Sequence, residues 1–349
     1  MKTLVLIPDL TKPGGVANYY KAIKNDMPDN VTYFVRGTRK GAGKVKNLLN
    51  FFLDYTRFIA KVFSYDKVLI NTSFAKSGVV RDAFFCLLCR LFFKKYSIFF
   101  RGWDERFEPQ ASKGLYGFLF KVSFLKASKI IVLSSAFSEF IKARGYKKKI
   151  VLETTIVDRS LFSNMDINQL ISDRSSQKPV ILFLSRLELN KGITETLAIH
   201  ERLSALGFDS QLAIAGTGSA QQMIDNIQDP DILKLGYVNG QAKVEAYKKA
   251  HFYIFPSTHG EGMPNSVLEA MMFGLPVLTT RVGGIRDFFT DKMGVSTEKP
   301  DVDAYVDFIT KSLTGEIDTR QIALTNHQYA LENFSQDVVA KRLLKEIAE

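Results

Sequence analysis

The chain has 349 residues, with 46% hydrophobic and 24% charged residues, which are the proportions of an ordinary folded protein. The length predicts two domains, and the composition excludes wholesale disorder. Two cysteines cannot build a disulfide scaffold, so we predict a reducing, cytoplasmic location. No apolar run looks like an export signal or approaches the ~20 residues that a membrane span needs.

The net charge of +11 is divided unevenly along the chain. Before Met165 there are 29 basic and 12 acidic residues, and from Met165 onward there are 18 and 24. A half with a net charge of +17 should attract phosphates, nucleic acid or an anionic membrane surface. Beside a basic, glycine-containing segment at 36–46, aromatic and aliphatic residues recur with helical spacing over 48–63. This pattern predicts either a helix packed on its own core or a helix that lies on a membrane.

Strand-like apolar runs alternate with helical patterns along the whole chain, which predicts parallel α/β sheets. The first series of runs lies at 4–8, 31–35, 68–71, 96–100, 130–133 and 150–152. The second lies at 180–185, 211–215, 233–236, 252–255 and 276–279. We therefore predict domains at 1–165 and 166–349, a polar linker within 164–179, and a last amphipathic helix at 334–347 that Ser335 opens.

Three glycine-containing segments are candidates for phosphate binding. Gly14 and Gly15 stand between the first strand and a helix, where free backbone amides can cradle a phosphate or carboxylate. The segment 37–45 does not fit a P-loop, because its glycines are six residues apart and Val45 replaces the magnesium-binding hydroxyl. Gln221 occupies the third glycine position of a dinucleotide fingerprint, so a dehydrogenase is not supported.

Two cations and two acids carry the strongest chemical signal. Arg186 ends a strand and Lys191 follows five residues later, a pair that suits a diphosphate, although surface salt bridges are the alternative. Glu261 is predicted in a glycine-rich loop and Glu269 inside the helix that follows. The two acids could then reach different parts of one extended ligand.

The ordered set GGVANY, SRLELNKG, AGTGS, LGYV, EGMPNSVLEAMMFGLPV and VGGI resembles the retaining glycosyltransferases of family 4. The resemblance implies a GT-B fold, in which two Rossmann-like domains with parallel sheets face each other across a cleft. It also implies that the C-terminal helix crosses back to the N-terminal domain. The C-terminal domain would hold a nucleotide-sugar, with a UDP- or GDP-sugar as co-substrate and no separate cofactor.

The resemblance also assigns roles to individual residues. Glu261 would contact the donor sugar, Glu269 the ribose, and Arg186 with Lys191 the diphosphate. The remaining donor contacts would come from Gly14, Gly15, Gly216, Tyr237, Gly262, Met263, Pro264 and Asn265. Fixed cations at the leaving oxygens stabilise the transition state, and losing one such group commonly costs ~10²-fold in rate. Arg186, Lys191 and Glu261 are therefore the predicted catalytic residues.

The chain departs from the family where a histidine motif often follows the fourth strand. Here Arg101, Trp103 and Asp104 occupy the segment, and we assign them to the acceptor side. Arg101 could serve a phosphate of the donor or of a lipid-linked acceptor, and Asp104 a sugar hydroxyl. Trp103 could stack on an acceptor ring or pack in the core. Cys86 and Cys89 suggest core packing, Asp301 and Asp303 a helix cap, and no metal is predicted.

The predicted function is transfer of a sugar, with retention, from a nucleotide-sugar to a glycan or lipid-linked oligosaccharide. The basic half favours an anionic, polyprenyl-diphosphate-linked acceptor at the inner face of the cytoplasmic membrane, as in capsular or surface polysaccharide assembly. A nucleotide-sugar epimerase of the same fold is one alternative. A basic nucleic-acid-binding protein is a more remote one, because the second half is acidic.

Overall fold

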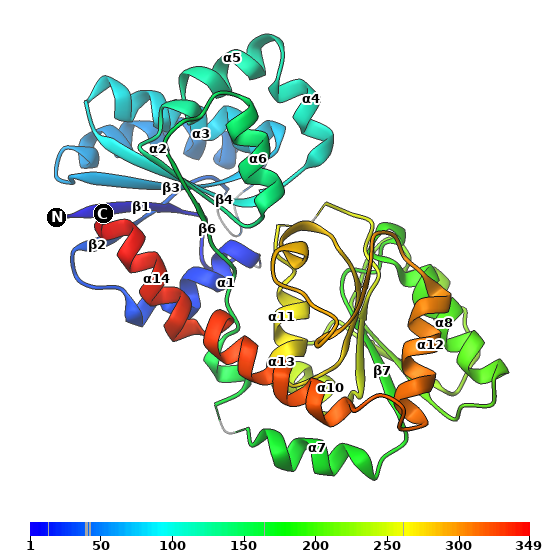
Figure 1. Cartoon of the computed structure of the whole chain (residues 1–349). Coiled ribbons are helices and arrows are strands. Elements are labelled where there is room, and N and C mark those ends of the chain that lie inside the picture. Colours follow the sequence, from blue (N-terminus) through cyan, green and yellow to red (C-terminus); the bar gives the residue numbers. More distant parts are fainter. Residues whose placement is uncertain (13, 39–40, 42, 164, 261) are drawn as a thin grey trace. The chain divides into compact units, whose positions relative to one another are not determined.

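The computed structural model describes residues 1–12, 14–38, 41, 43–163, 165–260 and 262–349, without the side chains of 44–46 and 48. The chain forms two compact units. The N-terminal unit comprises Met1–Thr155, Gly260–Met263 and Gln336–Glu349, and the C-terminal unit comprises Ile156–His259 and Pro264–Ser335. Each unit contains a six-stranded parallel sheet, so the predicted α/β class is confirmed (Figure 1).

The sheet of the N-terminal unit has the order β2-β1-β3-β4-β5-β6. Its strands are β1 (Thr3–Ile7), β2 (Val31–Val35), β3 (Lys67–Phe74), β4 (Lys95–Trp103), β5 (Lys129–Val132) and β6 (Lys149–Leu152). All five residues of β1 are buried, as expected for a parallel strand covered on both faces. Figure 1 shows α1 (Gly15–Ala22) and α14 (Gln336–Ala348) on one face of this sheet. The other face carries α2 (Lys44–Val62), α3 (Lys76–Leu91), α5 (Gly114–Val122) and α6 (Ser135–Ala143). The short α4 (Glu108–Ala111) precedes α5 in the crossover from β4 to β5.

The C-terminal helix α14 packs on the N-terminal unit, as the family resemblance implied. Its buried stripe includes Val339 and Leu343, which recur at helical spacing. Arg342 donates to the Glu153 carboxylate at 2.7 Å. These contacts explain why the last 14 residues belong to the unit that begins the chain.

The sheet of the C-terminal unit has the order β12-β11-β10-β7-β8-β9. Its strands are β7 (Val180–Leu184), β8 (Gln211–Ala215), β9 (Ile232–Gly236), β10 (Phe252–Phe255), β11 (Val277–Thr280) and β12 (Gly294–Thr297). One face carries α8 (Ile193–Ala205), α9 (Gln221–Asp225) and α12 (Val302–Leu313). The other carries α10 (Gly240–Lys249), α11 (Asn265–Met272) and α13 (Thr319–Phe334).

The segment predicted as a linker is a helix of the C-terminal unit. Helix α7 (Ile167–Ser175) begins where the Asp166 carboxylate accepts the amide of Asn168 at 2.8 Å. Near its end, the buried Arg174 donates to three backbone carbonyls, at 2.9 to 3.0 Å. The linker prediction is wrong because a short polar helix anchored by one buried arginine has the composition of a loop.

The compact units also differ from the predicted domain limits. Residues 156–163 and 165 belong to the C-terminal unit, whereas 260, 262–263 and 336–349 belong to the N-terminal unit. The last helix begins at Gln336 and not at Phe334, which ends α13. The domain limits predicted from composition assume one crossing between the domains. The chain passes between its two units four times.

Both sheets reverse their strand order at one place. In the N-terminal unit β1 lies between β2 and β3, and in the C-terminal unit β7 lies between β8 and β10. Open parallel sheets bind ligands outside the carboxyl ends of the strands at such a switch point. The two edges to search are therefore the carboxyl ends beside β1 and beside β7.

Candidate functional site

The two predicted cations lie in the loop that leaves the carboxyl end of β7. The Arg186 side chain is 62% exposed and donates to Glu188 Oε1 at 2.9 Å. Lys191 ends a short helix at Leu189–Lys191 and is 4% exposed. Its Nζ lies 6.0 Å from the centroid of the Phe255 ring. One cation is thus open to a ligand, and the other is withdrawn from water.

The residues that follow the next two strands share this edge. Gly216 follows β8 with φ +145, and a Cβ there would lie 1.8 Å from the carbonyl oxygen of Ser185. Only glycine fits, so the backbones of the β7 and β8 loops can approach each other closely. Tyr237 follows β9 and is 69% exposed. Gly216 therefore follows the strand next to β7, and Tyr237 follows the strand after that, at the same edge of the sheet as Arg186.

Helix α11 starts on the other side of the switch point, after β10. Pro264 precedes it and Asn265 is its first residue. Glu269, one turn later, is 7% exposed. Its Oε1 accepts from Lys243 Nζ at 2.7 Å, and its Oε2 accepts from the Tyr247 hydroxyl at 2.8 Å. These two donors hold the carboxylate that we predicted to contact a ribose.

Lys243 and Tyr247 are functional candidates that the sequence analysis missed. They lie four residues apart in α10, which puts them on one helical face. Burial, together with the charge of Glu269, raises the pKa of Tyr247 well above its usual value, so the phenol stays protonated and donates. The i, i+4 spacing of Lys243 and Tyr247 is visible in the sequence. Their contact with Glu269 of α11 is not, because it depends on how the two helices pack.

The remaining predicted donor residues lie between β10 and α11. Gly262 and Met263 belong to the N-terminal unit, as does Gly260. Glu261 lies outside the described residues. Its catalytic role, like those of Arg186 and Lys191, stays a prediction.

On the N-terminal unit, Gly14 is the N-cap of α1 and Gly15 is its first residue. The first amides of a helix have no intrahelical acceptor, so this end can bind an anion. Arg101 belongs to β4, and its guanidinium stacks over Tyr19 at 3.8 Å and Phe99 at 4.4 Å. Asp104 caps a short turn and pairs with Arg106 at 2.9 Å.

The proposed stacking of Trp103 on an acceptor ring is wrong. The indole is 5% exposed, and both of its faces are covered, by Phe74 at 4.1 Å and Phe137 at 4.2 Å between ring centroids. Its Nε1 donates to Glu108 at 2.7 Å. The packing alternative therefore holds, because no free face remains for a sugar.

The other side chains weighed in the sequence have structural roles. Cys86 and Cys89 are free thiols buried in α3, as expected for core residues. Asp301 Oδ1 accepts the amide of Ala304 at 3.0 Å and so caps α12, as predicted. Among the described residues, no group of three or more His, Cys, Asp or Glu could hold a metal ion. Within the same residues, no helix combines the length and apolarity of a membrane span.

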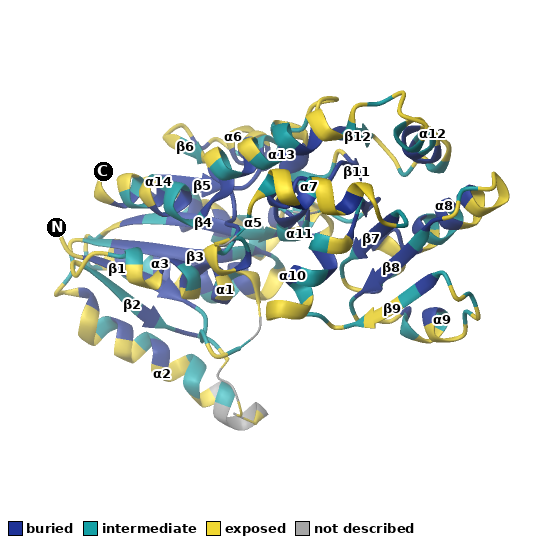
Figure 2. Cartoon of the chain, turned by 90° about the horizontal axis from the view of Figure 1, so that it is seen from below, coloured by how far each residue is buried: buried dark blue, intermediate teal, exposed yellow. Residues whose placement is uncertain are grey.

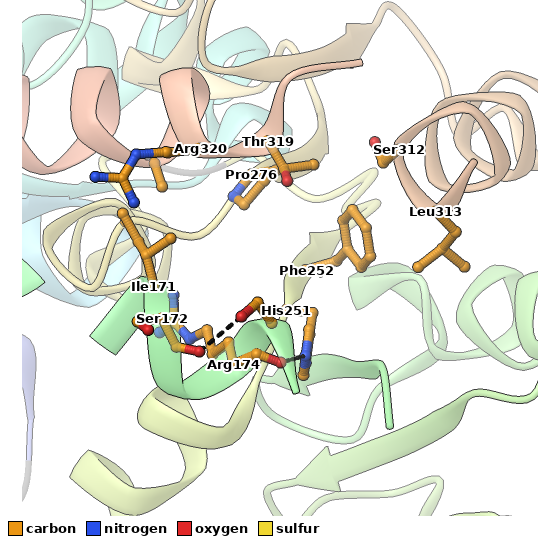
Figure 3. A pocket seen from close by; sticks show the side chains of 13 residues that line it. Ile171, Ser172, Arg174, His251, Phe252, Pro276, Ser312, Leu313, Thr319 and Arg320 are labelled. Atoms are coloured by element: carbon orange, nitrogen blue, oxygen red, sulfur yellow. Dashed lines mark hydrogen bonds between the residues drawn. The ribbon is translucent and has the colours of Figure 1, made fainter. Parts of the chain in front are cut away.

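A cavity of about 370 Å³ in the C-terminal unit lies at the opposite edge of the sheet (Figure 3). Phe252 and Pro276, which line it, stand at the amino ends of β10 and β11. Its buried Arg174 and half-buried His251 are engaged, since the His251 ring contacts the Arg174 carbonyl at 2.9 Å. Burial lowers the pKa of His251 below its usual value. This cavity is unrelated to the switch point, so we do not assign it to the donor.

Residues 166–328 match the sequence family of glycosyl transferases group 1. These residues are a group 1 glycosyltransferase segment. The segment contains Arg186, Lys191, Gly216, Tyr237 and Glu269, so it spans the whole carboxyl edge described above. The finer assignment to the retaining enzymes of family 4 stays a prediction.

The similar curated proteins carry glycosyltransferase names. Over 171 residues the chain is 26% identical to the capsular polysaccharide biosynthesis glycosyltransferase CapM of Staphylococcus aureus. This match covers 47% of this chain and 44% of CapM. Over 219 residues it is 25% identical to the putative teichuronic acid biosynthesis glycosyltransferase TuaC of Bacillus subtilis, with 62% and 54% covered. The chain thus spans about half the length of the curated relatives that it matches.

Solved glycosyltransferases share the complete two-unit fold. HepE of Anabaena, solved in complex with UDP and glucose, gives a TM-score of 0.73 at 16% identity over 100% of both chains. Sucrose-phosphate synthase from Thermosynechococcus elongatus gives a TM-score of 0.76 at 16% identity, with 100% of this chain and 98% of that chain covered. At this identity the likeness concerns the fold, and it confirms the predicted GT-B class with two Rossmann-like units.

Proposed function

We propose that the chain transfers a sugar from a nucleoside-diphosphate sugar to a hydroxyl of an acceptor, with retention of configuration. The observation that carries this proposal is the placement of Arg186 and Lys191 at the β7 switch point, inside the group 1 segment. The start of α11 follows the adjacent strand β10 and can add free backbone amides. A UDP- or GDP-sugar is the donor that we propose.

The two cations suit the leaving group in different ways. The exposed ion pair of Arg186 with Glu188 is worth only about 0 to 1 kcal/mol, so a diphosphate can take the place of the carboxylate. The planar guanidinium can then bind two phosphate oxygens at once. Lys191 is buried, and a charge held in a low-dielectric surrounding acts more strongly on the developing negative charge.

We propose a substitution on one face of the donor sugar. The bond from the anomeric carbon to the diphosphate breaks, and the acceptor oxygen bonds to the same face of that carbon. The leaving phosphate accepts the proton of the acceptor hydroxyl. Fixed side-chain cations stabilise the diphosphate in this scheme, so we propose that neither a metal ion nor another cofactor is required. Trapping of a covalent glycosyl-enzyme would overturn this scheme.

We propose a glycan or lipid-linked oligosaccharide as the acceptor, in surface or capsular polysaccharide synthesis, at the cytoplasmic face of a membrane. Support comes from α2, which has both buried and exposed positions along its length (Figure 2). Phe58 is buried, whereas Leu49, Phe52 and Leu53 are exposed. These last three side chains are 52% to 60% exposed. An apolar face on a unit rich in lysine and arginine suits the interface of an anionic membrane. Binding to anionic vesicles is its direct readout.

A thermal-shift screen of the intact chain with UDP-, GDP- and ADP-sugars tests the proposed function. A ligand at 100 times its dissociation constant stabilises the protein by about 2.7 kcal/mol. We expect a shift with one nucleotide family and with its free nucleoside diphosphate. The proposal fails if none of the three families raises the melting temperature at millimolar concentration.

A further inference from the structure

Two adjoining cavities open at the carboxyl edge of the N-terminal sheet, beside the switch point at β1. Their volumes are about 180 and 300 Å³, and they share Pro8, Val16, Arg36 and Arg81 as walls. The smaller cavity also reaches Arg101 at the end of β4. A water occupies about 30 Å³ of liquid, so each cavity has room for a charged substituent together with part of a sugar ring.

The charge of these walls is strongly positive. Lys12, Arg36, Arg81 and Arg101 line the cavities, and Asp9 is the one acid among the described lining residues. Behind the wall, the buried Asp82 is shared by Arg36 at 3.1 Å and Arg81 at 2.8 Å. Asp54, which accepts the Gly37 amide at 2.7 Å, is a second carboxylate close to both arginines. The acids Asp9, Asp54 and Asp82 are outnumbered by Lys12, Arg36, Arg81 and Arg101, so a positive charge remains.

Arg36 shows most clearly that a partner is missing. It is 4% exposed, and its Nη2 donates to the Asn71 carbonyl and to Asp82. Its Nε is buried with no hydrogen-bond partner among the described residues, and the same holds for Nη1 of Arg101. Burial lowers the pKa of Arg36 to about 10 against the opposing charge of Asp82, so the side chain stays charged at neutral pH.

We propose that the smaller cavity is a subsite for an oxyanion, a carboxylate or a phosphate, carried by the acceptor. An oxyanion between Arg36, Arg81 and Arg101 would accept from the buried donors and balance the excess charge. The cavity is built from the N-terminal unit alone, whereas the proposed donor cations belong to the C-terminal unit. The assignment of this oxyanion to the acceptor rests on the proposed function. Oxyanion binding itself does not, because it can be measured without turnover.

Calorimetric titration of the intact chain tests this inference with four probes. Glucuronic acid supplies a carboxylate, glucose 1-phosphate a phosphate, glucose a neutral ring, and UDP the donor side. We expect saturable binding of at least one charged sugar, and glucose should bind about tenfold more weakly or worse. The difference between the two charged sugars identifies which oxyanion the cavity prefers. Equal binding of glucose and both charged sugars would overturn the inference.

Three arginine variants locate the binding. Arg81→Gln and Arg101→Gln should each weaken the charged sugar by about tenfold or more and leave UDP affinity unchanged. Arg90→Gln is the matched control, since Arg90 is an exposed residue of the same helix as Arg81 and lines neither cavity. Should Arg81→Gln fail to fold, Arg101→Gln carries the test, because Arg101 is held mainly by ring contacts.

The outcomes separate this inference from the proposed function. A parallel loss of UDP and charged-sugar affinity in Arg81→Gln and Arg101→Gln would assign the cavity to the donor and overturn the inference. Wild-type affinity in both variants would overturn it as well. If charged sugars bind as predicted while no nucleotide or nucleotide-sugar binds, the subsite stands and the proposed function fails.

Discussion

Arg186 and Arg202 offer a matched comparison at the scale of single residues. Both are exposed arginines of the C-terminal unit, each paired with a carboxylate at 2.9 Å, but only Arg186 stands at the switch point. We predict that Arg186→Ala lowers the rate of nucleoside-diphosphate release by ~10²-fold, the usual cost of losing one fixed charge at a leaving group. Arg202→Ala should stay within about twofold, as a surface substitution does.

We predict that Lys191→Ala also lowers the rate of nucleoside-diphosphate release. Thermal melting of each variant separates loss of chemistry from loss of folding. An equal effect of Arg186→Ala and Arg202→Ala on the release rate would contradict the role of Arg186.

Asp82 makes the N-terminal unit sensitive to acid. Burial alone would raise the pKa of Asp82, but the charges of Arg36 and Arg81 outweigh it and hold the pKa below its usual value. Between the folded-state and unfolded-state pKa values of Asp82, the unfolded chain binds more protons than the folded one. The contribution of the charged Asp82 to stability is therefore complete above about pH 4. It is lost as the pH falls through the folded-state pKa.

We predict that Asp82→Asn costs about 3 to 5 kcal/mol of unfolding free energy at pH 7, because it leaves Arg36 buried without its counter-charge. The difference from the wild type should shrink as the pH falls below 4. Urea unfolding at several pH values measures both effects, and the exposed Asp29→Asn is the control. A difference that does not change with pH would show that Asp82 is not held as a charged group.

The roles of some single residues can be predicted from the sequence, and those of others depend on tertiary contacts. Arg186, Lys191 and Glu269 were visible because each has a fixed place in a motif. Trp103 was ambiguous, since its burial depends on Phe74 and Phe137 from two other elements. The cluster of Arg36, Asp82 and Arg81 joins β2 with α3, and no local spacing in the sequence indicates it.

Helix α2 tests the membrane proposal at the scale of an element. Phe52 is 60% exposed, so Phe52→Glu should leave the unfolding free energy within about 0.5 kcal/mol of the wild type. We predict that this variant loses most binding to anionic vesicles in sedimentation at physiological salt. Leu206→Glu, which changes a 58% exposed residue of the C-terminal unit, is the control for the added negative charge. Equal vesicle binding by the wild type and both variants would rule out α2 as the contact.

Helix α14 is predicted to stabilise the N-terminal unit. Leu343 is fully buried, so Leu343→Ala should lower the unfolding free energy by about 2 to 5 kcal/mol. Lys341→Ala changes an exposed residue of the same helix and should have little effect. Denaturant unfolding measures both variants. If they unfold alike, α14 is a terminal extension and not part of the core.

The strands were predicted within a few residues because buried parallel strands appear as continuous apolar runs. Strand β12 was missed because Val295 is the one apolar side chain among its four residues, Gly294–Thr297. Gly294 opens it with φ +141, and a Cβ there would lie 2.1 Å from the carbonyl oxygen of Val277. Such a strand is set by its neighbour β11 and not by its own composition.

At the scale of the whole molecule, the sequence predicted the number of units and their fold class but not how the chain is shared between them. Residues 260, 262–263 and 336–349 belong to the N-terminal unit although they follow most of the C-terminal one in sequence. Periodicity describes local structure and carries no information about which sheet a segment joins. The return of the last helix was expected only from the family resemblance.

The division of charge between the halves has a functional counterpart in this account. The strongly basic first half contains the proposed oxyanion subsite and the proposed membrane-facing helix. The acidic second half nevertheless places Arg186 and Lys191 at its switch point. A net charge therefore does not indicate where a nucleotide binds, because two side chains at a strand end are enough.

The most direct test of the central claim is a proton NMR time course of the intact chain with the nucleotide-sugar that the thermal screen selects. The anomeric proton of the donor reports its consumption, and the new anomeric signal reports the configuration of the first product, whether the acceptor is a sugar or water. We predict release of the nucleoside diphosphate and a first product with the configuration of the donor. No consumption of the donor would contradict sugar transfer, and a first product of opposite configuration would contradict retention.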